Sequence, residues 1–119
     1  MAMEVLKENV INEVQRELNR ANKKYPLFNS IHESYAVILK EAEETGEALE
    51  KAQRSLAILW DKVRGKEVPC SLQEVTHPAH IAEEFVLVAC EAIQAAAMCL
   101  KYGISVDTEE PETGGMADE

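Results

Sequence analysis

Three glutamates on one predicted helix could bind a metal ion. In the segment Glu43-Glu44-Thr45-Gly46-Glu47, Glu44 and Glu47 stand one helical turn apart, and Glu43 lies four residues before Glu47. Carboxylate oxygens are the ligands that Mg²⁺ prefers, and the ion keeps several waters that a phosphate substrate can replace. The simpler alternative is a solvent-exposed acidic face whose charge is compensated by neighbouring lysine and arginine residues. The sequence leaves both interpretations open.

A further candidate ligand, Glu91, lies in the most apolar stretch of the chain. Phe85–Leu100 reads FVLVACEAIQAAAMCL, and its only polar residues are Glu91 and Gln94, which share one helical face. The length and the Ala, Leu and Met content of this stretch predict a helix that packs on more than one side. A lone carboxylate buried there costs several kcal/mol unless it is paired or bound to metal. We therefore expect a partner for Glu91, and Glu84, two turns earlier, lies on the same stripe.

Three long helices account for most of the sequence. Apolar residues at spacings of three and four predict helices over Glu4–Asn22, Ile31–Arg64 and Pro78–Tyr102. Ser30 and Glu33 form a predicted capping box before the second helix, and Gly65 and Gly103 are the predicted stops of the second and third. The predicted fold class is all-α, a helical bundle of about three main helices.

The chain is expected to form one domain over residues 1–103, followed by an acidic tail over residues 104–119. The tail contains six acidic residues and no basic one, together with two glycines, and we expect it to be disordered. Three helices, one of them apolar on every side, do not close a monomer well. We therefore expect a homodimer or a higher homo-oligomer that completes the bundle.

Composition argues against several classes of partner. The net charge of −10 offers no basic patch for nucleic acid. The apolar run of sixteen residues is shorter than a bilayer span requires and has Glu91 near its centre, so we expect no membrane insertion. The first residues are charged and lack the apolar core of a signal peptide. Three cysteines, an odd number, are typical of reduced thiols, and the expected location is the cytoplasm.

The two acidic segments resemble a known family. Glu43-Glu44-Thr45-Gly46-Glu47 matches the Glu-Glu-x-x-Glu motif of the MazG-like all-α nucleoside triphosphate pyrophosphohydrolases. The preceding segment from Ile31 to Glu41 looks like the lead-in found in phage and bacterial MazG-like proteins. Glu91-Ala92-Ile93-Gln94-Ala95-Ala96-Ala97-Met98 looks like the helix that closes the site of these proteins. The resemblance covers roughly residues 31–102.

The resemblance implies an enzyme that hydrolyses a nucleoside triphosphate to a monophosphate and pyrophosphate, with Mg²⁺ or Mn²⁺ as cofactor. A house-cleaning role towards nucleotides would fit this chemistry. The resemblance implies that Glu44, Glu47 and Glu91 bind the metal. Glu43 would be a further ligand or lie beside the ligands. A carboxylate that does not bind the metal, Glu43 or Glu84, would take the proton from the attacking water.

The substrate side of the predicted site is less well defined. Lys51 and Arg54 continue the Glu44–Glu47 stripe and could hold the outgoing pyrophosphate, although ordinary ion pairs with Glu47 and Glu50, four residues earlier, explain them more simply. Gln94, a candidate substrate contact, stands where the family has Asp. A neutral amide is a poorer Mg²⁺ ligand and cannot deprotonate water. The alternative function is therefore a helical binding or assembly protein that keeps the fold without catalysis.

Overall fold

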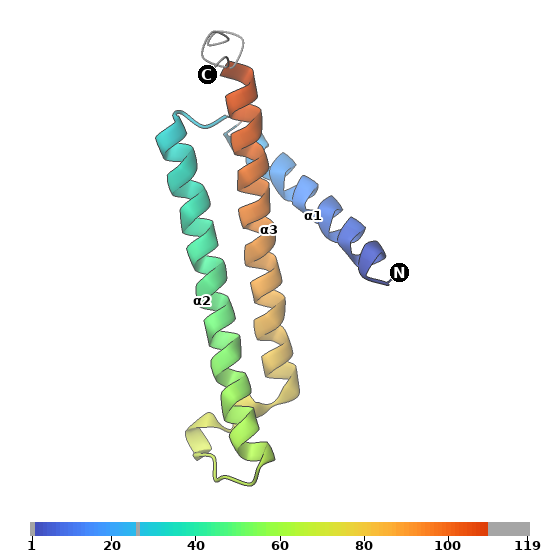
Figure 1. Cartoon of the computed structure of the whole chain (residues 1–119), viewed down its shortest axis with the longest axis vertical. Coiled ribbons are helices and arrows are strands. Elements are labelled where there is room, and N and C mark those ends of the chain that lie inside the picture. The colour runs from blue at the N-terminus through green and yellow to red at the C-terminus, as the bar shows by residue number, and fades with distance from the viewer. Residues whose placement is uncertain (1, 26, 110–119) are drawn as a thin grey trace, which may run out of the picture. The chain divides into compact units, whose positions relative to one another are not determined.

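A computed structural model of the chain describes residues 2–25 and 27–109. These residues form three α-helices, two short 3₁₀-helices and no strand (Figure 1). The predicted all-α fold class is therefore confirmed for this part of the chain. The elements are α1 (Ala2–Lys24), α2 (Ile31–Val63), η1 (Cys70–Leu72), η2 (Glu74–Thr76) and α3 (Pro78–Glu109).

The ends of α2 follow from local sequence signals. At its start the Ser30 Oγ accepts a hydrogen bond from the Glu33 backbone N–H at 3.0 Å, as the predicted capping box requires. The Glu33 carboxylate accepts from the backbone N–H of Asn29 at 2.6 Å, one residue earlier than in the standard motif. Beyond the C-terminal end, Gly65 has a φ of 88°, the left-handed conformation that ends helices at glycine.

The predicted end of the third helix at Gly103 is wrong, because α3 continues through this glycine to Glu109. Part of the segment predicted as a disordered tail is therefore helical, and residues 110–119 lie outside the described residues. The Ser105 side chain is buried and its Oγ accepts a hydrogen bond from the Phe28 backbone N–H at 3.2 Å. Such packing outweighs the roughly 1 kcal/mol by which glycine disfavours a helix.

The described chain divides into two compact units, and both α2 and α3 contribute to each. The first unit combines Met1–Glu41 with Ile93–Glu119. Its core holds Val14 and Leu18 of α1 and Ala97 and Met98 of α3, surrounded by five half-buried apolar residues, Ala21, Phe28, Val37, Ile38 and Ile93. The predicted stripe of α1 is thus buried only over its C-terminal half, and Leu6 and Val10 are exposed.

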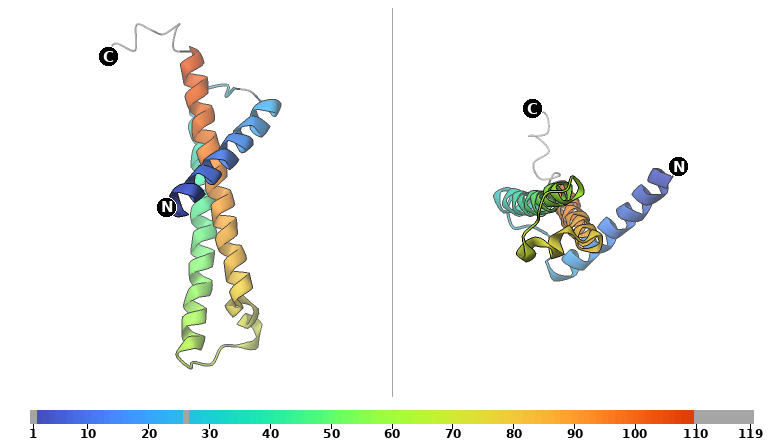
Figure 2. Two further views of the ribbon diagram at one scale, coloured as in Figure 1. Left: turned by 90° about the vertical axis from the view of Figure 1, so that its right-hand side faces the viewer. Right: turned by 90° about the horizontal axis from the view of Figure 1, so that it is seen from below.

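The second unit, Ala42–Ala92, holds the candidate functional residues. Its part of α2 and its part of α3 lie side by side and run in opposite directions, as Figures 1 and 2 both show. Between these two helix segments lies a seam of buried and half-buried side chains. The seam consists of Glu44, Ala48, Ala52 and Ser55 on α2 and Ile81, Glu84, Val88 and Glu91 on α3.

By length and composition, the stretch Pro78–Ser105 of α3 could cross a membrane. This stretch is longer than the sixteen-residue run on which the expectation of no membrane insertion was based. The core helix of a soluble protein passes the same test, so the observation is weak evidence. Only 17% of its most apolar window is buried within the chain, so much of its apolar surface has no cover here.

Candidate functional site

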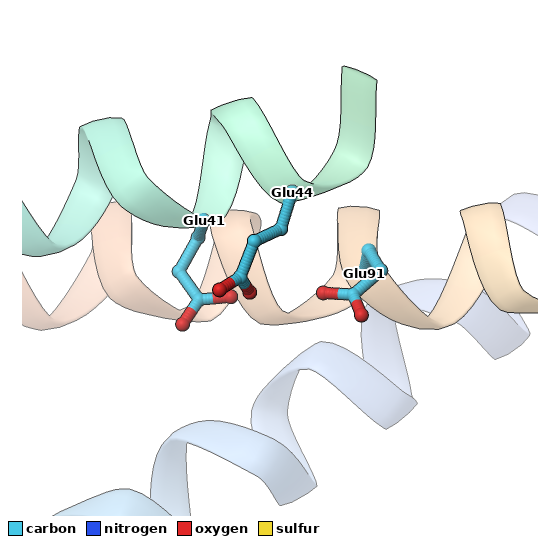
Figure 3. A group of neighbouring side chains, drawn as sticks. All are labelled: Glu41, Glu44 and Glu91. Carbon is cyan, nitrogen blue, oxygen red and sulfur yellow. The ribbon is translucent and has the colours of Figure 1, made fainter. Parts of the chain in front are cut away.

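Two carboxylates from different helices meet in the seam of the second unit. An oxygen of Glu44 on α2 and an oxygen of Glu91 on α3 lie within 4.8 Å of each other, and both side chains are half-buried. Figure 3 shows the two side chains extending towards the same region. Within the described part of the chain, Glu91 has no hydrogen bond or ion pair. The carboxylate of Glu44 has the same charge as that of Glu91, so a compensating partner for Glu91 stays a prediction.

Small residues allow this approach of the two helices. Ala52 and Ser55 are buried on α2, and Ala48 is half-buried one turn before them. Their spacing of three and four keeps one narrow face of α2 towards α3. Glu44 occupies the next turn on this face, so its longer side chain reaches into the seam instead of into open solvent.

Glu41 extends the acidic group on α2. It precedes Glu44 by one helical turn, is half-buried, and offers an oxygen within 4.8 Å of a Glu44 oxygen (Figure 3). Glu41 is not among the predicted ligands, because it lies outside the Glu-Glu-x-x-Glu segment. Glu41 lies on the same face of α2 as Ala48 and Ala52, and this spacing could have identified it from the sequence.

The other predicted ligand and base on α2 lie outside this group. Glu43 and Glu47 are exposed, and neither belongs to the clustered carboxylates. Glu47 as a metal ligand therefore stays a prediction. Lys51 and Arg54 are also exposed and continue along the solvent-facing side of α2. Gln94 is half-buried and belongs to the first unit.

Glu84 is buried and has a different partner. Its Oε2 lies 3.2 Å from Nε2 of His80, and its Oε1 is buried with no hydrogen-bond partner in the described part of the chain. Seven residues of helix separate it from Glu91, a rise of about 10 Å. One carboxylate cannot reach across that distance to a water held between Glu44 and Glu91. We therefore do not assign the role of base to Glu84.

The histidines near η2 serve local structure. His77 Nδ1 accepts a hydrogen bond from the backbone N–H of Ala79 at 3.1 Å, which satisfies one donor at the start of α3. His77 and His80 line a hollow of about 470 Å³ together with Glu74 and Glu83. Among the described residues these side chains are not grouped closely enough to share a metal ion, whereas oxygens of Glu41, Glu44 and Glu91 lie within 4.8 Å of one another.

A second hollow lies in the first unit. It has a volume of about 410 Å³ and is lined by Ile31, His32, Tyr35, Ile38 and Tyr102. Its lining is mainly apolar and aromatic. Sequence reasoning did not assemble this group, because Tyr102 comes from α3 and the other residues come from the first turns of α2.

No protein-family model, curated protein or solved structure matches the chain. Function is therefore inferred from the arrangement of the carboxylates and from the sequence motifs that contain them.

Proposed function

We propose that the protein is a Mg²⁺-dependent nucleoside triphosphate pyrophosphohydrolase of the MazG-like type. The observation that carries the proposal is the approach of Glu44 and Glu91 to within 4.8 Å. These residues come from the two segments that resemble the family, 47 positions apart in the sequence. Both side chains are half-buried, whereas Glu43 and Glu47 of the same acidic segment are exposed.

The donors fit a hard cation. Glu44 and Glu91, with Glu41 beside Glu44, offer only carboxylate oxygens, the ligand type that suits Mg²⁺ and Mn²⁺. Half-burial favours a bound ion, because repulsion between the carboxylates is less screened there than in open solvent. When bound, the metal would neutralise the triphosphate and polarise the phosphorus under attack.

The chain's own residues would supply the remaining steps. A water attacks the α-phosphorus, its proton passes to a carboxylate, and the bond from the α-phosphorus to the bridging oxygen breaks to release pyrophosphate. Glu43 is the candidate base, because it is exposed next to Glu44. Lys51 and Arg54 are exposed two to three turns further along α2 and would bind the outgoing phosphates.

A second candidate is a binding or assembly protein that lacks catalysis. Gln94 favours this alternative, because it stands where the resembling family has Asp and an amide cannot accept a proton as a carboxylate does. The large apolar residues exposed on α2 and α3 also favour an assembly role. Both functions use the same fold and differ in whether triphosphates are hydrolysed.

The deciding experiment measures product formation from a panel of ribo- and deoxynucleoside triphosphates with Mg²⁺ or Mn²⁺. We expect monophosphate and pyrophosphate, and we expect Glu44→Gln and Glu91→Gln each to reduce the rate at least 100-fold. Glu50→Gln is the matched control, because Glu50 is an exposed glutamate of α2 outside the acidic group. Diphosphate with inorganic phosphate, or no turnover with any substrate, would reject the proposal, and the second outcome would favour the assembly protein.

A further inference from the structure

Phe28, in the connection between α1 and α2, contacts α3 through both its backbone and its ring. Its backbone N–H donates to the Ser105 Oγ at 3.2 Å, and the Lys101 ammonium lies 4.8 Å from the centroid of its ring. The Ser105 Oγ in turn donates to the Lys101 carbonyl at 3.0 Å, one helical turn earlier. All three residues belong to the first unit. We call Phe28, Lys101 and Ser105 the latch.

Lys101 depends on Phe28 for its burial. The residue is 5% exposed, and within the described part of the chain it has no ion pair. A charged ammonium is costly to remove from water unless another group compensates for the lost hydration. The face of an aromatic ring attracts a cation, and this attraction is stronger where water is excluded. If the Phe28 ring moved away, the Lys101 ammonium would therefore return to solvent.

The sequence of α3 beyond Gly103 disfavours a helix. Residues 104–109 read ISVDTE, in which Ile, Val and Thr are branched at Cβ and Ser and Asp are also weak helix formers. The last turn contains no basic residue, and Asp107 and Glu109 lie near the end at which the helix dipole favours cations. Gly103 is the residue type at which helices commonly end. The helical state of residues 104–109 therefore requires contacts outside the helix, and the Ser105 hydroxyl makes one with Phe28.

We propose that the latch is a conformational switch that selects between two ends of α3. When Phe28 is docked, α3 continues to Glu109. When Phe28 is released, α3 ends at Gly103, the Lys101 side chain reaches water, and the connection between α1 and α2 loses this attachment to α3. The two segments open together, because Phe28 and the last turns of α3 stabilise each other. The buried core residues of α1 and α3 lie outside the latch, so the opening is local.

The switch also acts on the hollow lined by Tyr102. Tyr102 follows Lys101 directly, and Ile31 and His32 of the same hollow come three and four residues after Phe28. Both sides of the hollow are thus joined to the latch by short stretches of chain. Release of the latch places Tyr102 in the last turn of a shortened helix, where helices fray. A closed latch therefore favours a formed hollow. The proposal does not depend on the proposed enzymatic function.

Amide hydrogen exchange of the full chain, followed by NMR, measures the opening directly. Phe28→Leu removes the ring and keeps an apolar side chain and the backbone donor. We expect it to accelerate exchange of the amides of residues 105–109 by roughly 10-fold or more, with the amides of the second unit unchanged. Leu27→Ala is the matched control, because Leu27 is the neighbouring apolar residue and is 43% exposed. This control should leave the exchange at the wild-type rate.

Two further substitutions test the charge and the hydrogen bond of the latch. Lys101→Met removes the ammonium and keeps a long side chain, so in the Phe28→Leu background it should return the exchange of residues 105–109 towards the wild-type rate. Ser105→Ala removes the acceptor for the Phe28 backbone N–H. It should therefore accelerate exchange of the Phe28 amide and of the amides of residues 105–109 by about the same factor, because the two segments open together.

Circular dichroism shows whether each variant keeps its helices, and Ser105→Ala provides the test if Phe28→Leu fails to fold. Three results would overturn the proposal. In the first, the wild-type amides of residues 105–109 exchange as slowly as those of the first-unit core, which means that this segment opens only on global unfolding. In the second, Phe28→Leu and Ser105→Ala leave these amides at the wild-type rate, or Leu27→Ala accelerates them equally. In the third, Lys101→Met does not slow exchange in the Phe28→Leu background.

Discussion

Replacing Glu91 with Gln tests whether the seam binds a cation. Glu91→Gln keeps the shape of the side chain and removes one of the two charges whose oxygens lie within 4.8 Å. If a divalent ion balances those charges, the substitution should weaken metal binding. It should also stabilise the protein without metal, because it removes the repulsion from Glu44.

The size of both effects can be estimated from the distance. Two unit charges at 4.8 Å repel by about 1 kcal/mol in water and by about 3 kcal/mol at an effective dielectric constant near 20. Half-buried groups fall between these limits, so the metal-free variant should be more stable than the wild type by about 1–2 kcal/mol. For the wild type, Mg²⁺ at ten times its Kd should add about 1.4 kcal/mol, or roughly 5–10 °C in Tm.

Thermal melts at one fixed protein concentration make the comparison, with Mg²⁺ and with a chelator. We expect a clear Mg²⁺-dependent rise in Tm for the wild type, no such rise for Glu91→Gln, and a wild-type response for Glu50→Gln. The reasoning is refuted if Mg²⁺ stabilises the wild type and Glu91→Gln equally. It is also refuted if the variant without metal is less stable than the wild type.

Two further outcomes follow from the contacts of α3. Removing the chain from Gly103 onwards should lower Tm by roughly 5–15 °C in a thermal melt, because it deletes the Ser105 hydroxyl that accepts from the Phe28 backbone N–H. Removing only residues 110–119 should leave Tm unchanged, and equal effects of the two truncations would contradict this assignment. Glu84→Gln should maintain or raise Tm, because a neutral amide costs less free energy to bury than a carboxylate with one oxygen that accepts no hydrogen bond. It should also leave pyrophosphate release intact, and loss of that activity would restore Glu84 as a candidate base.

The three helices could be predicted because their signals are local. Apolar periodicity marks each helix, and Ser30 and Gly65 mark the two ends of α2 through a side-chain cap and a left-handed φ. The end of α3 could not be predicted in the same way. A Cβ added at Gly103 would meet no atom within 4 Å outside its own helical turns, so no close contact requires glycine there. What extends the helix is the contact of Ser105 with Phe28, 77 residues away in the sequence.

The candidate site was predictable only in part. Glu44 and Glu91 were selected by motif and by burial cost, and the structure brings them together. Glu41 was missed because its role depends on the rotation of α2 about its axis, which small seam residues such as Ala52 determine. The burial of the most apolar stretch of α3 was predicted less well than its helical structure, since Phe85 in this stretch is 39% exposed. Composition shows which surface favours burial, but it does not show what covers it.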